Sequence, residues 1–219
     1  MRVGFDLDGV FADMDSALIN QAQSLFGDKL ARQEPPPAIN FDPLAPAGTG
    51  PVEALPVPGQ LHLTPRQQRR LWRHIATIDN FWLTLREIEP GSVNRLGTIA
   101  IRHRWEVIFL TKRPSTAGLP AQVQSQRWLV SKGFERPSVF VVQGSRGRIA
   151  AALDLDVVVD DRHENCYDVV VDSGARALLV WRDGGRQFSA AAERLGVEVV
   201  RTVGEGLDVL TLSDASPRT

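Results

Sequence analysis

The chain has 219 residues, enough for one domain or for a domain with a modest insertion. Hydrophobic residues make up 43% and charged residues 23%, as in ordinary globular proteins, and the net charge of −1 argues against broad binding to a nucleic-acid backbone. The only cysteine is Cys166, which excludes an intramolecular disulfide and argues against a cysteine-based zinc site. Because no long apolar stretch is present, we expect no signal peptide, no membrane span and a cytoplasmic location.

The first third of the chain begins with a short apolar run at 2–7, which predicts a buried strand, and continues with a predicted helix over 13–27. Residues 31–63 differ sharply, because eight prolines fall between positions 35 and 58. Such a segment cannot hold a regular helix or a central strand, and we expect a long loop.

Two further helices are expected before the regular part of the chain. Thr64 can cap a helix that has Pro65 at its first position, where proline fits. An aromatic patch follows at 80–83, and a helix is expected from about residue 91 to His103.

From residue 105 onward, predicted strands alternate with predicted helices. Strands are expected at 105–111, 138–142, 156–160, 176–181 and 197–200, and helices at 119–133, 146–154, 164–172, 187–195 and 204–212. This alternation is typical of an α/β fold, a Rossmann-like parallel sheet with helices on both faces. We therefore expect an α/β core made of residues 1–12 and 90–219, and a small, mostly helical cap inserted after strand one at 13–89, with its proline-rich loop at 31–63.

Functional groups in parallel sheets gather at the carboxyl ends of the strands. Asp6 and Asp8 follow the first strand, Thr111 ends the second, and Asp160 and Asp161 end the 156–160 strand. Carboxylates brought together repel one another, and a divalent cation removes that cost. Hard oxygen ligands without a histidine or cysteine cluster predict Mg²⁺, which in turn suits a phosphate monoester as substrate.

Three segments resemble the haloacid dehalogenase superfamily in its phosphatase branch: FDLDGVFAD at 5–13, FLTKRP at 109–114 and VVVDDR at 157–162. The resemblance implies that Asp6 is the nucleophile, that Asp8 is the general acid and base, and that Thr111 binds the phosphoryl group. It also implies that Asp6, Asp160, Asp161 and the backbone carbonyl of Asp8 hold Mg²⁺.

The superfamily also has a Lys or Arg that neutralises the phosphoaspartate. No lysine stands in the corresponding region, so Arg148 is the first candidate for this role and Arg146 the second.

The inserted segment resembles that of 5'(3')-deoxyribonucleotidases, in which aromatic side chains stack on the nucleobase. By this resemblance Phe11, Phe81 and Trp82 would contact the base. Lys112 and Arg113, the basic residues directly after Thr111, are the candidates for binding substrate through its phosphate oxygens. Ordinary core packing of the aromatic side chains and plain surface positions for Lys112 and Arg113 remain the alternatives.

The favoured substrate is a nucleoside monophosphate, and a sugar phosphate or another small organic phosphate is the alternative. A phosphate-binding protein that has kept the fold without turnover is a third interpretation. The expected partner is a small phosphorylated metabolite, with no nucleic-acid polymer and no membrane, and the oligomeric state is open.

Overall fold

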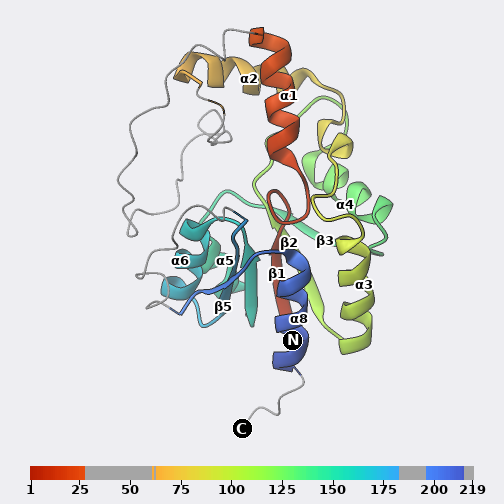
Figure 1. Ribbon diagram of the computed structural model, residues 1–219, viewed down its shortest axis with the longest axis vertical. Coiled ribbons are helices and arrows are strands. Elements are labelled where there is room, and N and C mark those ends of the chain that lie inside the picture. Colours follow the sequence, from red (N-terminus) through yellow and green to blue (C-terminus); the bar gives the residue numbers. More distant parts are fainter. Residues whose placement is uncertain (28–60, 62, 183–195, 215–219) are drawn as a thin grey trace.

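The computed structural model describes residues 1–27, 61, 63–182 and 196–214 (Figure 1). Its centre is a six-stranded, all-parallel sheet in the order β3-β2-β1-β4-β5-β6. The strands are β1 Arg2–Asp6, β2 Glu106–Thr111, β3 Ser138–Val141, β4 Val157–Asp160, β5 Arg176–Val180 and β6 Glu198–Val200. The α/β fold class and all six predicted strands are confirmed.

The strand order brings the three predicted motifs together. β1 lies between β2 and β4, and Phe5 is in register with Phe109 on one side and with Val159 on the other. Because all three strands run in the same direction, their carboxyl ends meet at one edge of the sheet. The segments that carry Asp6, Thr111 and Asp160 are thus neighbours.

Helices connect the strands nearly as predicted. They are α1 Met14–Phe26, α2 Pro65–Thr77, α3 Ser92–His103, α4 Ala121–Ser131, α5 Arg146–Ala152, α6 His163–Asp172 and α8 Val203–Asp214, with the short 3-10 helix η3 at Phe81–Thr84. The helix predicted at 187–195 and nearly all of the proline-rich segment 31–63 lie outside the described residues.

Alternating strand residues build two apolar layers. Phe109 packs in one cluster with residues of α3, α4 and α8, whereas its neighbour Leu110 packs in another with residues of α5 and α6. In β4, Val157 and Val159 belong to the first cluster and Val158 to the second. Side chains of a strand point alternately to opposite faces, so helices cover both faces of this sheet.

The inserted helices α1 and α2 lie beyond the carboxyl edge of the sheet (Figure 1). Asp13 caps α1 and Thr64 caps α2, and the two helices are joined by a 3.0 Å hydrogen bond between His74 Nε2 and Gln21 Oε1. Leu71 belongs to the same buried cluster as the sheet residues, so the inserted helices pack onto the core of the fold. The predicted division into core and cap stays a prediction.

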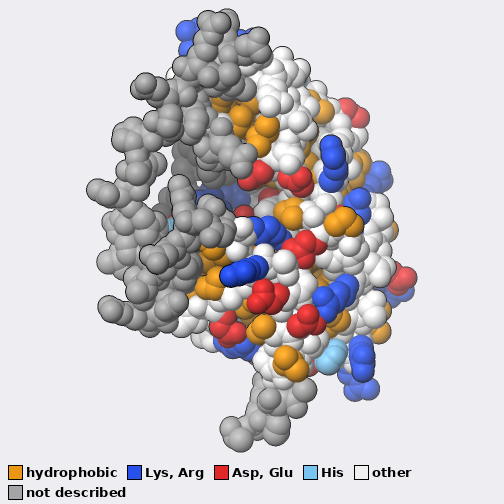
Figure 2. All heavy atoms as spheres, viewed as in Figure 1, with side chains coloured by type: hydrophobic (Ala, Val, Ile, Leu, Met, Phe, Trp, Pro, Cys, Tyr) orange, Lys and Arg blue, Asp and Glu red, His pale blue; other side chains and the backbone are white. Residues whose placement is uncertain are grey.

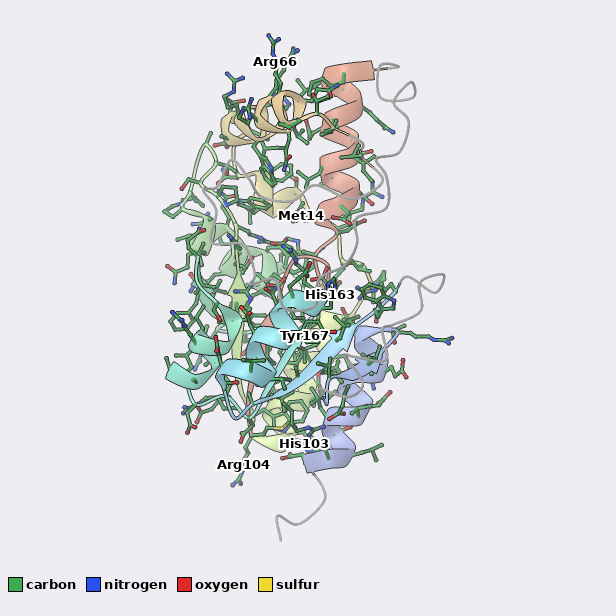
Figure 3. The ribbon with its side chains drawn as sticks, turned by 90° about the vertical axis from the view of Figure 1, so that its left-hand side faces the viewer. Met14, Arg66, His103, Arg104, His163 and Tyr167 are labelled. Carbon is green, nitrogen blue, oxygen red and sulfur yellow. The ribbon has the colours of Figure 1, made fainter. Side chains whose placement is uncertain are left out.

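The surface carries charges of both signs. Acidic and basic side chains lie interspersed on the face seen in Figure 2. On the inserted helix α2, Arg66 points away from the sheet, at the end of the molecule opposite His103 and Arg104 (Figure 3). Among the described residues, no helix combines the length and the apolar character that crossing a membrane requires.

Candidate active site

Asp6 is the last residue of β1, and the chain turns sharply after it. The amides of Phe11 and Ala12 both donate to the carbonyl oxygen of Leu7, at 2.9 and 2.8 Å, and Gly9 N donates to Ala12 O at 3.0 Å. This turn keeps Asp8 at the sheet edge beside Asp6 instead of letting the strand continue.

The Asp6 carboxylate is buried against a guanidinium group. Arg146, the first residue of α5, places Nη2 2.5 Å from Asp6 Oδ1 and Nε 3.4 Å from Asp160 Oδ2, and so bridges the two carboxylates. Burial, together with the negative charge of Asp160, raises the pKa of Asp6 well above its usual value, although the positive charge of Arg146 opposes this shift. Burial and the charge of Asp160 together thus outweigh the stabilisation that Arg146 gives to ionised Asp6.

Asp8 is held by groups from the end of β2 and the loop after it. Thr111 Oγ1 donates to Asp8 Oδ2 at 3.0 Å, and Arg113 donates through Nη2 to Oδ1 at 2.7 Å and through Nε to Oδ2 at 2.9 Å. The Arg113 side chain has no exposed surface and donates its remaining nitrogen, Nη1, to Ser125 Oγ. The guanidinium also lies over the Trp82 ring, 5.0 Å from its centroid.

The two acids at the end of β4 differ in their surroundings. Both Asp160 oxygens accept from Asn165 Nδ2, and Oδ1 also accepts from Arg162 N at 2.9 Å. Asp161 lies against Gly9, and burial together with the charge of Asp160 raises its pKa well above the usual value. Sequence reasoning missed Asn165; its one signal was a polar residue in the first turn of the helix that follows the Asp-Asp pair.

The structure brings Arg146, not Arg148, to the carboxylates. The Arg148 side chain is 85% exposed and its nearest acid is Asp172, at 3.9 Å. At 3.6 residues per turn, two positions along α5 turn a side chain by about 200° to the other side of the helix. Of the two candidates for the basic residue, the structure places Arg146 beside the carboxylates and Arg148 away from them.

Lys112 and Arg113, the two basic residues after Thr111, lie in different surroundings. Arg113 is buried and bound to Asp8, so it is not placed to contact substrate directly as predicted. Lys112 is half-buried, and burial followed by the positive charges of Arg162 and Arg146 lowers its pKa. Its ammonium group therefore lies within electrostatic reach of the arginines of the site.

The three predicted stacking side chains are buried. Phe11 and Trp82 have no exposed surface and Phe81 only 2%. Phe11 packs edge-on to Phe109, at a centroid distance of 6.2 Å, and Trp82 Nε1 donates to Pro114 O at 3.0 Å. In this structure the rings are therefore covered by neighbouring side chains and present no open surface to a nucleobase.

Solved structures of known proteins share this architecture over nearly their whole length. A haloacid dehalogenase-like hydrolase from Xanthomonas campestris matches with a TM-score of 0.53 and 16% identity, over 98% of this chain and 96% of that one. A candidate beta-phosphoglucomutase from Thermotoga maritima gives 0.54 and 17%, over 96% and 98%. A haloacid dehalogenase-like protein from Streptococcus pneumoniae, SP0104, gives 0.52 and 13%, over 95% and 97%.

The fold is that of haloacid dehalogenase-like hydrolases. No protein-family model matches the sequence, and no curated protein sequence matches it either. At 13–17% identity, the likeness establishes the arrangement of strands and helices and leaves the chemistry to be argued from the residues.

The acids at this edge offer carboxylate oxygens, which are the kind of ligand that a hard divalent cation prefers. Asp6 and Asp161 are buried carboxylates with raised pKa values, so nearby positive charge would stabilise their ionised forms. In the arrangement seen here Arg146 provides that charge for Asp6 and Asp160. Within the described ranges, no three His, Cys, Asp or Glu side chains are grouped so that they could hold a metal ion.

Proposed function

We propose that this protein is a phosphoric monoester hydrolase that works through an aspartyl-phosphate. One observation carries the proposal: two acids two residues apart, Asp6 and Asp8, follow the strand at the centre of the motif-bearing edge, next to Thr111 and Asp160 on the flanking strands. An aspartate nucleophile with a second carboxylate as proton carrier is an established route for phosphoryl transfer. The haloacid dehalogenase-like fold supports the same chemistry.

In the first half of the reaction, a carboxylate oxygen of Asp6 attacks the phosphorus atom of the monoester. The bond from phosphorus to the ester oxygen breaks, and protonated Asp8 gives that oxygen its proton, so that the alcohol leaves. The Thr111 hydroxyl, which donates to Asp8 Oδ2 at 3.0 Å, would turn its single hydrogen to a phosphoryl oxygen when substrate binds at this edge. Arg146 offsets negative charge beside Asp6.

In the second half, Asp8 removes a proton from water and the resulting hydroxide attacks phosphorus. The bond between phosphorus and the Asp6 oxygen breaks, which releases inorganic phosphate and restores both carboxyl groups to their starting forms. Arg113 binds both Asp8 oxygens and holds this carboxyl group in one orientation for the two proton transfers.

A magnesium ion belongs to this proposal as the cofactor. Asp6, Asp160, Asp161 and the backbone carbonyl of Asp8 would hold it. When bound, it would supply positive charge to the phosphoryl group and to the nucleophile. The raised pKa values of Asp6 and Asp161 support this assignment, since both carboxylates lie where added positive charge is stabilising.

The substrate class proposed is a small phosphorylated metabolite. A nucleoside monophosphate was favoured because of the aromatic side chains of the insertion, and their burial removes that reason. A sugar phosphate is the second candidate, since one neighbour of similar fold is named as a candidate beta-phosphoglucomutase. Both classes therefore belong in the test.

The test is phosphate release from a panel of 5'- and 3'-nucleotides, sugar phosphates and an aryl phosphate, with Mg²⁺ and with a chelator. Asp6→Asn keeps the size of the side chain but replaces the attacking oxygens by an amide, so we expect no turnover. Asp208→Asn is the matched control, because Asp208 pairs with Arg95 on the exposed side of α8. Activity of Asp6→Asn equal to that of the control would refute the mechanism.

The same panel separates an enzyme from a protein that only binds phosphate. Binding of inorganic phosphate to the wild-type protein, without release from any ester in the presence of Mg²⁺, would favour the non-catalytic scaffold. Turnover that requires Mg²⁺ and is severely reduced by Asp8→Asn would exclude it.

A further inference from the structure

A charged pair outside the predicted motifs is attached to the loop that follows Asp8. Arg182, two residues beyond the end of β5, donates through Nη1 to the carbonyl oxygen of Gly9 and through Nη2 to that of Val10, the latter at 3.0 Å. The same Nη2 donates to Glu89 Oε1 at 2.9 Å. One guanidinium group thus binds two consecutive carbonyls of this loop and a carboxylate.

Glu89 in turn fixes this arrangement to the body of the fold. Its Oε1 accepts from Val203 N at 2.8 Å and its Oε2 from Gly204 N at 3.0 Å, the first two residues of α8. A carboxylate at a helix N-terminus is favoured by the free N–H groups and the helix dipole. Although burial alone would raise it, hydrogen bonds from Val203, Arg182 and Gly204 lower the pKa of Glu89, so the pair is charged at neutral pH.

The other side of the loop is attached to the segment just before Glu89. Asp13 N donates to Arg86 O at 2.9 Å, and Ile88 N donates to Phe11 O at 2.8 Å. These bonds hold the far end of the loop, residues 11–13. The hydrogen bonds from Arg182 hold its near end, where the two peptide groups directly follow Asp8.

We propose that Arg182 and Glu89 are positioning residues that hold the loop after Asp8 in its working conformation. The inference rests on the proposed function, because Asp8 is the proton carrier of that reaction. Rotation of the peptide groups of Gly9 and Val10 would turn the Asp8 backbone and move its carboxyl group away from Asp6. Arginine suits the role because its fork of N–H donors reaches several acceptors, whereas a lysine ammonium is a point charge.

The experiment compares Arg182→Gln and Arg182→Lys with a matched control at the start of β5, the strand that precedes Arg182. Arg176 begins β5 at the opposite edge of the sheet and binds Glu198 at 2.6 Å, so Arg176→Gln removes an Arg–Glu pair remote from the site. We expect Arg182→Gln to lower kcat about tenfold with KM within twofold, because substrate contacts remain while Asp8 is misplaced. Arg182→Lys should recover only part of the loss, and Arg176→Gln should leave kcat unchanged.

Glu89→Gln tests whether the two residues act together. Because the described contacts link the Glu89 side chain to the loop through Arg182, the double variant should lose no more kcat than Arg182→Gln alone. Additive losses would show that the two side chains act separately and would overturn their assignment as one unit.

Hydrogen exchange of the Phe11 and Ala12 amides gives a readout that needs no turnover. Both amides donate to Leu7 O, so loosening of the loop should speed their exchange in Arg182→Gln and not in Arg176→Gln. Unchanged exchange, or kcat equal to that of the control, overturns the inference. A wild-type protein that releases no phosphate refutes the proposed function instead, and the exchange data still decide whether Arg182 holds the loop.

Discussion

Gly9 offers a sharp test of the site because its Cα lies against an acid. A Cβ built on Gly9 would stand 1.9 Å from Asp161 Oδ2 and 2.4 Å from its Cγ, and the backbone φ is +82°. Ordinary contact begins at 3.4 Å, so Gly9→Ala must move the carboxylate by about 1.5 Å, the difference between the two distances. A misplacement of ~1 Å can cost ~100-fold in rate, and we expect a loss of that order in kcat/KM.

Gly91→Ala separates this clash from backbone strain. Gly91 has a similar φ of +86°, and no described atom lies within 4 Å of its Cβ position. Both substitutions force alanine into the left-handed region, at about 1–2 kcal/mol. For a domain of this size, that corresponds to a fall in Tm of roughly 2–8 °C, measurable by thermal unfolding. Only Gly9→Ala should also lose activity.

A third comparison uses the variant Asp161→Ala, which lacks the obstructing carboxylate. When Gly9→Ala is added to this variant, Tm should fall by no more than it does in Gly91→Ala, because only backbone strain remains. Equal activity of Gly9→Ala and Gly91→Ala would refute the assignment of Asp161 to the site. An undiminished stability cost in the Asp161→Ala background would refute the steric argument itself.

Three further predictions concern residues whose placement the structure revises or adds. Arg146→Ala should abolish phosphate release, whereas Arg148→Ala should leave it unchanged, because only the first side chain touches the buried carboxylates. Trp82→Phe leaves Pro114 O without its donor, so the free energy of unfolding, measured by heat or denaturant, should fall by about 1–3 kcal/mol. Its activity on nucleotides and on an aryl phosphate should change by the same factor. Since the pKa of Glu89 is lowered in the folded state, its contribution to stability is present above its usual pKa and is lost as pH falls below that value. The Tm difference between wild type and Glu89→Gln should therefore shrink in acid, and a difference independent of pH would contradict this.

The sheet could be predicted because its strands are continuous apolar runs. β4 is buried along its whole length, and the predicted limits of the six strands differ from the observed ones by at most one residue at either end. The polar groups that end β1, β2 and β4 then had to meet, because parallel strands share one carboxyl edge. Topology alone thus located Asp6, Thr111 and Asp160.

The sequence limits the basic residue of the site to two candidates, Arg146 and Arg148, but does not decide between them. The expected helix at 146–154 begins at the same residue as α5, so the helix start does not decide between Arg146 and Arg148. The sequence does not show which side of the helix faces the buried carboxylates. Arg146 is the first helical residue and therefore stays next to the carboxyl edge. The rotation of about 200° between these two positions decides which arginine reaches Asp6.

The aromatic side chains show a different limit. A sequence marks Phe81 and Trp82 as large and apolar, and such residues serve equally as core and as ligand surface. Their role depends on what covers the rings. Here the Arg113 guanidinium lies over Trp82, and Phe81 packs edge-on to Trp82 at a centroid distance of 5.0 Å. The Arg113 contact comes from a segment far from Trp82 in the chain, which local patterns do not report.

The contacts at the site give a structural reason for the excess of arginine over lysine in this chain. Of the 25 basic residues only three are lysines. Arg146 binds Asp6 and reaches Asp160, Arg113 binds both oxygens of Asp8 together with Ser125, and Arg182 binds two carbonyls and an acid. A lysine carries a single nitrogen and cannot span acceptors in these directions. The buried acids of this edge are therefore held by the forked geometry of guanidinium groups as much as by their charge.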